Sequence, residues 1–114
     1  MRRFDGLNIE LTRGDSTQFK VNFAGQTLPE GALALFTVKK SPRSTEPVIE
    51  KRMAISDGST YVLLSNKDTD IQPRTYYWDI RVLVPFGDGT YDVKTPMEYA
   101  AFTILEVIGD AWVY

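Results

Sequence analysis

Apolar and polar residues alternate with a period of two along most of this chain, and no other feature constrains the fold as strongly. The clearest example is segment 75–84, where large apolar residues occupy every second position: Tyr76, Trp78, Ile80, Val82 and Val84. Successive side chains of a strand point to opposite faces, whereas a helix repeats every 3.6 residues. The pattern predicts a half-buried β-strand, and we expect this strand at the centre of a sheet.

The same alternation recurs in segments separated by turn-forming residues. These segments are residues 7–12, 18–23, 34–38, 48–55, 61–64, 91–95 and 99–107. Clusters such as Arg13–Ser16, Asp57–Gly58 and Phe86–Gly89 lie between them and predict turns. Short, regularly spaced strands are typical of sandwiches and barrels. We therefore expect an all-β antiparallel sandwich of about seven to eight strands.

Length and composition fit one ordinary globular domain. The chain has 114 residues, of which 43% are hydrophobic and 25% charged. A chain of this size buries roughly two-thirds of the surface that its unfolded form exposes, which is enough for one core. We expect residues 1–114 to form a single domain without an internal linker.

The absence of histidine and cysteine narrows the possible chemistry. Without these residues there is no Ser-His-Asp or Cys-His pair, no zinc site of the common type and no disulfide. We expect no enzyme, no catalytic residues, no cofactor and no metal site. Calcium remains an alternative for the oxygens of Asn66, Asp68 and Asp70, and also for those of Asp57 and Asp88, although Asx-type turns explain these residues more simply.

Charge and hydropathy argue against two classes of partner. The formal net charge is -2, and no cluster of Lys and Arg forms a stripe that could bind nucleic acid. No apolar run approaches membrane-spanning length, and the basic start at Arg2 and Arg3 is not followed by an apolar stretch. We expect neither nucleic acid nor membrane as partner, and synthesis in the cytosol.

Several residues are candidates for a binding surface. Tyr77 lies on the polar face of segment 75–84, and Phe86 begins a predicted turn, so we expect both to be exposed. The aromatic residues Tyr76, Tyr77, Trp78, Tyr91 and Tyr99 could instead form a platform for sugar rings, but Tyr76 and Trp78 are expected inside the core. Arg13-Gly14-Asp15 matches a cell-adhesion tripeptide, although its residues are also ordinary turn formers.

The last seven residues are unusually apolar for a chain terminus. Three large side chains, Trp112, Val113 and Tyr114, follow the turn formers Gly109 and Asp110. This segment either folds back as an edge strand, reaches a neighbouring subunit or is disordered. We therefore predict an interface that includes Trp112, Val113 and Tyr114 together with Tyr77 and Phe86.

The order of four segments resembles the small immunoglobulin-like domains of bacteriophage tail and baseplate proteins, as at the amino end of baseplate upper proteins. The likeness extends over nearly the whole chain. The segments are Thr12–Ser16 leading into Phe19 and Val21, then Phe36–Lys40, then Asp68–Tyr76, and finally Tyr77–Arg81. Such domains tend to have Gly just before the aromatic strand, where this chain has Arg74.

This resemblance implies an immunoglobulin-like sandwich and a structural role in a virion or a phage-derived tail. It implies assembly with other tail proteins and formation of a homo-oligomer, with the chain made in the host cytoplasm and then built into the virion. In this fold a tyrosine corner ties the start of a central strand to the preceding loop, and Tyr76 occupies the matching position. The alternative from another class is a small carbohydrate- or receptor-binding module.

Overall fold

The computed structural model describes residues 2–5, 7–23 and 28–107, and these ranges contain strands, turns and loops but no helix. The predicted all-β class is therefore confirmed. The strands are β1 (Arg2–Asp5), β2 (Asn8–Thr12), β3 (Thr17–Asn22), β4 (Leu33–Lys39), β5 (Ile49–Ala54), β6 (Ser59–Leu64), β7 (Arg74–Pro85), β8 (Tyr91–Lys94) and β9 (Ala100–Leu105).

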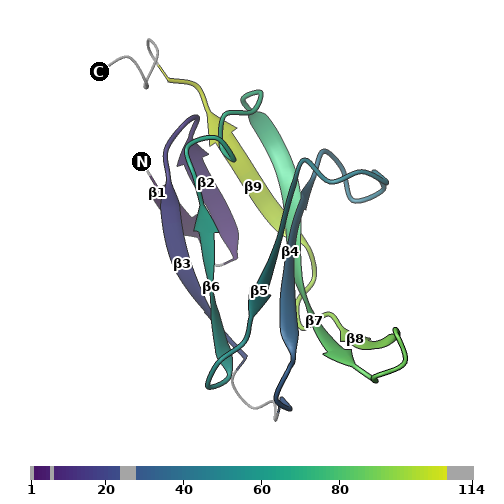
Figure 1. The fold of residues 1–114 in the computed structure, drawn as a ribbon. Coiled ribbons are helices and arrows are strands. Elements are labelled where there is room, and N and C mark those ends of the chain that lie inside the picture. The colour runs from purple at the N-terminus through teal and green to yellow at the C-terminus, as the bar shows by residue number, and fades with distance from the viewer. Residues whose placement is uncertain (1, 6, 24–27, 108–114) are drawn as a thin grey trace.

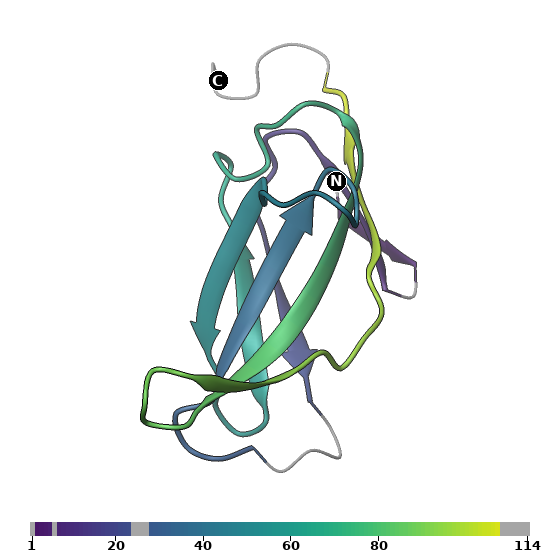
Figure 2. The same ribbon diagram turned by 90° about the vertical axis from the view of Figure 1, so that its right-hand side faces the viewer.

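The strands form two sheets of very different size that face each other as a β-sandwich (Figure 1). The large sheet has the order β1-β2-β9-β7-β4-β5, with β8 also paired to β7, and the small sheet consists of β3 and β6. Figure 2 looks onto the outer side of the large sheet, where β5, β4 and β7 lie side by side in front of β3 and β6.

Two features of the large sheet differ from the prediction. β2 pairs with β9 in parallel, so the sheet is mixed, and the prediction of a purely antiparallel sandwich was wrong. These strands come from opposite ends of the chain, so no tight hairpin sets their relative direction. β1, antiparallel to β2, is a strand that we did not predict, because its four residues are too few to show alternation.

The core lies between the sheets and is filled by the apolar positions of the alternating segments. Phe36 of β4 is fully buried at the centre of this core. The centroid of its ring lies 5.4 Å from the ring centroid of Trp78, 6.0 Å from that of Phe19 and 6.3 Å from that of Phe102. The Trp78 indole Nε1 donates a hydrogen bond of 2.9 Å to the Leu7 carbonyl, which satisfies its polar group. The expected burial of Trp78 is thus confirmed.

β7 is the central strand of the large sheet, as predicted. Its first half pairs with β9 on one side, β4 pairs along the other side, and its second half pairs with β8. It has strands on both edges, and its alternating side chains reach both faces of the sheet. β7 therefore contributes side chains both to the core and to the outer face of the large sheet.

Asp57 and Gly58 form the turn between β5 and β6, at the position predicted from the sequence. Both residues have positive φ, 52° and 72°, and Ser56 pairs with Ser59 across the turn. Positive φ at both central residues is characteristic of a type I′ turn, whose twist matches that of an antiparallel hairpin. The positive φ of Gly58 is the reason for a glycine at this position, because a Cβ there would meet no atom within 4 Å.

Candidate interaction surfaces

The outer face of the large sheet is the broadest candidate surface. Its side chains occupy the positions that alternate with the core residues of β4, β5 and β7. The strand register places them in four rows across the sheet, and we name each row by its chemistry. They are the apolar row Ala54, Leu33, Leu83 and Val93; the basic row Arg52, Leu35 and Arg81; the acidic row Glu50, Thr37 and Asp79; and the tyrosine row Lys39, Tyr77 and Ala101.

The basic and acidic rows are direct neighbours. Arg81 Nε lies 3.9 Å from Asp79 Oδ2, and both side chains are partly exposed. On β5, Arg52 and Glu50 are likewise exposed and two residues apart on the same face. These two rows therefore carry two positive and two negative groups in adjacent lines, with neutral Leu35 and Thr37 between them.

A groove of about 280 Å³ crosses the acidic and tyrosine rows. Tyr77 and Tyr99 meet there edge to face, with ring centroids 5.7 Å apart. Pro42, Thr45 and other residues of the β4–β5 loop also line the groove. An aromatic pair beside carboxylates and a guanidinium can contact a planar or ring-shaped partner group.

The β7–β8 hairpin is the second candidate surface. It extends beyond the body of the sandwich (Figures 1 and 2). Three of its large apolar side chains are exposed: Phe86 by 64%, Val93 by 46% and Tyr91 by 41%. Large apolar groups gathered on a projecting element are typical of protein contact sites.

The tip of this hairpin is held by local hydrogen bonds. Phe86 N donates to the Thr90 carbonyl at 3.0 Å, and Asp88 Oδ1 accepts from both the backbone N and the hydroxyl of Thr90. These hydrogen bonds from Thr90 lower the pKa of Asp88 below its usual value. The predicted turn is thus present, and the Asp88 carboxylate is part of it.

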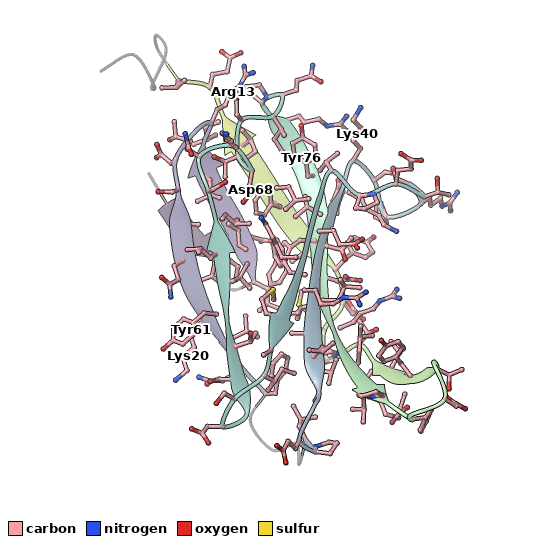
Figure 3. The ribbon with its side chains drawn as sticks, viewed as in Figure 1. Arg13, Lys20, Lys40, Tyr61, Asp68 and Tyr76 are labelled. Atoms are coloured by element: carbon pink, nitrogen blue, oxygen red, sulfur yellow. The ribbon has the colours of Figure 1, made fainter. Side chains whose placement is uncertain are left out.

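Polar contacts hold the loop before β7 in place. Figure 3 shows Arg13, Asp68 and Tyr76 at the end of the sandwich where this loop lies. The buried Tyr76 donates its hydroxyl to the Gln72 carbonyl at 2.6 Å, which confirms the bond predicted for a tyrosine corner. Arg13 Nε pairs with Asp70 Oδ1 at 2.9 Å, joining the β2–β3 turn to this loop. The corner is therefore anchored from two sides.

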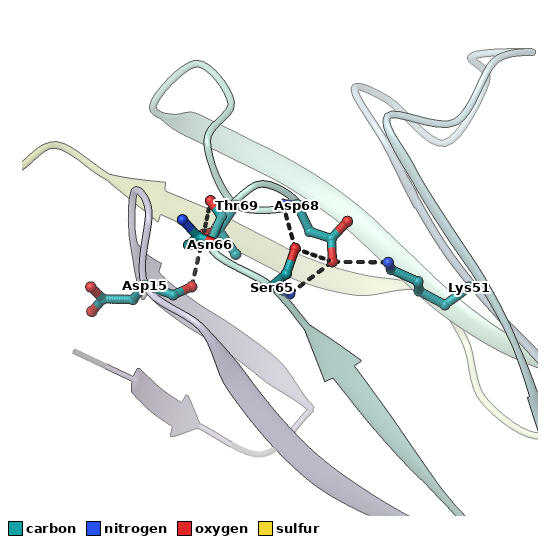
Figure 4. A network of polar contacts seen from close by, with 6 residues as sticks. All are labelled: Asp15, Lys51, Ser65, Asn66, Asp68 and Thr69. Atoms are coloured by element: carbon teal, nitrogen blue, oxygen red, sulfur yellow. Dashed lines mark hydrogen bonds and ion pairs between the residues drawn. The ribbon is translucent and has the colours of Figure 1, made fainter. Parts of the chain in front are cut away.

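Asp68 and Thr69 fix the same loop (Figure 4). Asp68 Oδ2 accepts hydrogen bonds from the N and Oγ of Ser65 and lies 2.9 Å from Lys51 Nζ. Burial acts to raise the pKa of Asp68, but Lys51 and Ser65 outweigh it, so the pKa lies below its usual value of 3.8. The fully buried Thr69 donates its hydroxyl to the Asp15 carbonyl at 2.7 Å.

The Arg13-Gly14-Asp15 tripeptide and the acidic side chains of the loop before β7 make contacts within the chain. Asp15 N bonds to the Thr12 carbonyl and Gly14 has φ 86°, so Arg13-Gly14-Asp15 forms the predicted turn, with Arg13 directed to Asp70. Asp68 and Asp70 each have a cationic side-chain partner. Among the residues that the structure describes, no group of three or more acidic side chains could hold a metal ion.

The structure places two of the five predicted interface residues. Tyr77 lies on the outer face, half-buried in the groove, and Phe86 is at the hairpin tip. Trp112, Val113 and Tyr114 lie outside the described residues. Sequence reasoning missed the two charged rows, although charges two positions apart, at 50 and 52 and at 79 and 81, could have indicated them.

The small sheet carries a third, smaller exposed patch. Tyr61 and Leu63 of β6 point away from the core, and Lys20 Nζ lies 5.9 Å from the centre of the Tyr61 ring (Figure 3). This cation–π contact covers part of the ring and reduces its exposed apolar surface.

Comparisons with known proteins give no assignment. No model of a known protein family matches the chain, and no curated protein matches it significantly in sequence. Within the described residues, no helix is present that is long and apolar enough to cross a membrane.

Proposed function

We propose that this chain is a non-enzymatic structural protein of a phage or prophage, a tail or baseplate component that acts by joining neighbouring proteins. In this proposal it is made in the host cytoplasm and then built into the virion. The observation that carries the assembly role is the projecting β7–β8 hairpin with exposed Phe86, Tyr91 and Val93. The virion assignment rests on the resemblance of the four sequence segments to phage domains.

Two features support the immunoglobulin-like part of the proposal. The order β9-β7-β4-β5 facing β3-β6 corresponds to strands G, F, C and C′ facing B and E of a variable-type domain. The hydrogen bond from Tyr76 to the Gln72 carbonyl has the place and direction of a tyrosine corner, near the start of strand F. Two features differ: β1 pairs with β2 and not with β3, and β8, between β7 and β9 in the chain, is a further strand paired to β7.

Purified particles test this proposal. Particles from an induced host culture would be separated from free protein on a density gradient, and the chain would be sought in each fraction by mass spectrometry. We expect it to co-sediment with particles or free tails at a fixed ratio to the other tail proteins. Recovery in the free-protein fraction alone would contradict the virion role.

A second function, sugar binding, is favoured by one specific observation. The Tyr77–Tyr99 pair lines a groove together with Glu50 and Asp79, and carbohydrate sites combine aromatic faces with carboxylate acceptors. If the groove binds a sugar, a saturating oligosaccharide should raise the melting temperature of the wild type and not that of Tyr77→Ala. An assembly protein should form ordered oligomers without any response to the sugars.

A further inference from the structure

The arrangement of charges on the outer face is complementary to itself. The basic row and the acidic row are adjacent and parallel, and both run from β5 across β4 to β7. The apolar row lies beyond the basic row, and the tyrosine row lies beyond the acidic row. A rotation that exchanges the two ends of the strands therefore exchanges the basic row with the acidic row and the apolar row with the tyrosine row.

A two-fold axis performs this exchange when it lies between the basic and acidic rows, parallel to the face and perpendicular to the strands. Two faces related by this axis oppose each other with their strands antiparallel and with each strand over its own copy. Such an interface uses the same patch on both partners. The other in-plane axis, along the strands, would place each charged row on its own copy and is disfavoured by like-charge repulsion.

The facing pairs follow from the strand register. Arg52 opposes Glu50 of the second copy, and Arg81 opposes the second copy's Asp79. Beyond the charged rows, Ala101 opposes the exposed Val93 and Lys39 opposes Leu33, whereas Leu83, which lies opposite Tyr77, is only 7% exposed and adds little contact. Because the axis repeats every contact, the interface contains four opposite-charge contacts, with the Ala101–Val93 contact at both ends.

The size of the face sets the strength of such a contact. Four strands at a spacing of about 4.8 Å and seven residues at about 3.4 Å give a flat footprint of about 450 Å². Stable complexes bury about 800 Å² of accessible surface per partner, so this face is at the small end of specific interfaces. We expect a dissociation constant in the micromolar range.

We propose that the outer face of the large sheet binds a second copy of this chain, basic row against acidic row, across a two-fold axis perpendicular to the strands. This inference deepens the proposed function and rests on its assembly role, because it names a second copy as one of the partners.

Two double charge reversals test the pairing. Arg52→Glu/Arg81→Glu makes all four row charges negative, and Glu50→Arg/Asp79→Arg makes all four positive. Analytical ultracentrifugation over micromolar to millimolar concentrations should find wild-type dimers. Each double variant should dimerise about a hundredfold more weakly, because every charged contact becomes repulsive. An equimolar mixture of the two variants should form a heterodimer, which also shows that both have folded.

A matched control separates row pairing from general charge effects. Lys20→Glu/Lys67→Glu changes the net charge by the same amount as Arg52→Glu/Arg81→Glu, at exposed positions outside the outer face. This control should dimerise like the wild type and should not form heterodimers with the all-positive variant. Higher salt should weaken the wild-type dimer, because the pairs lie near solvent.

Three results would overturn the proposal. They are a wild type that stays monomeric at every concentration, double variants that dimerise as well as the wild type, and monomeric variants that fail to combine on mixing. None of these results affects the virion role, which the particle fractions test separately. A monomer found in particles would exclude only the self-pairing, and a dimer absent from particles would exclude only the virion role.

Discussion

Replacing Tyr76 by Phe removes one hydroxyl group from the corner before β7 and leaves the aromatic ring in place. That hydroxyl donates the 2.6 Å bond to the Gln72 carbonyl, and the side chain is only 1% exposed. A hydrogen bond in a folded protein contributes about 0.5–1.5 kcal/mol, and a buried group left without its partner costs about 1–3 kcal/mol. We expect Tyr76→Phe to lower the free energy of unfolding by about 1–2 kcal/mol.

The melting temperature gives a direct measure of this loss. At about 2.1 cal/mol/K per residue, a chain of this length has an unfolding entropy of about 0.24 kcal/mol/K, so each kcal/mol shifts the melting temperature by about 4 °C. Tyr76→Phe should therefore melt about 4–8 °C below the wild type in calorimetry. Tyr91→Phe makes the same chemical change at an exposed position of β8 and serves as the control.

The burial of the Tyr76 side chain also predicts a change in the response to alkaline pH. Burial raises the pKa of Tyr76 above its usual value of 10.0, although Arg74 and Arg13 act to lower it. A group whose pKa is higher in the folded state stabilises fully below the unfolded pKa, and this stabilisation is lost as pH rises through the folded pKa. The wild type should thus lose more stability above pH 10 than Tyr76→Phe does. Equal melting temperatures for Tyr76→Phe and Tyr91→Phe would refute the reasoning.

Three further predictions concern other parts of the molecule. Because the pKa of Asp68 in the folded protein lies below 3.8, its contribution to stability is present above pH 3.8 and is lost as the pH falls through the folded-state pKa. Asp68→Asn should therefore reduce the loss of unfolding free energy at acid pH, measured by urea titration at a series of pH values. Phe36→Ala should lower the free energy of unfolding by about 3–5 kcal/mol in the same titration, because it opens a cavity in the centre of the core. Phe86→Ala should change it by no more than about 0.5 kcal/mol and weaken only contacts with partner proteins. Equal losses of stability in the two variants would contradict the assignment of Phe36 to the core and Phe86 to the surface. Deleting residues 111–114 should lower either the melting temperature or the oligomer mass seen by light scattering, and no change in both would remove the reason for assigning this segment to an interface.

Local sequence was sufficient for the strands and their faces, because alternation is a local property. Alternation in segment 34–38 assigns Ala34, Phe36 and Val38 to one face, and all three are buried. β7 was expected at the centre of a sheet, and it has neighbouring strands on both edges. Turn chemistry was similarly local, since the Asp57-Gly58 pair has the positive φ values that a type I′ turn needs.

Pairings between distant segments could not be predicted in this way. The parallel contact of β2 with β9 joins residues about ninety positions apart, and nothing in either segment encodes the direction of its neighbour. Leu83 shows the same limit. Its position in the alternation assigns it to the face of β7 that carries Tyr77, and it lies there, yet it is only 7% exposed, in a row between Leu33 and Val93.

The candidate surfaces were predicted only one residue at a time. Tyr77 and Phe86 were chosen for their positions on a strand and in a turn, and both are accessible to a partner. Their neighbours became known only with the sheet order, which brings Tyr99 against Tyr77 and aligns Arg52 with Arg81 through Leu35.

The sequence by itself determined that the chain is all-β, which residues alternate toward the core, and that His- or Cys-dependent chemistry is excluded. These conclusions follow from the geometry of a single strand and from the inventory of side chains, so they need no tertiary information. The tertiary structure decided the strand order, the parallel pair and the rows of charge on the outer face. A row across a sheet is a property of register between strands, and register is set by contacts between segments that are remote in the chain.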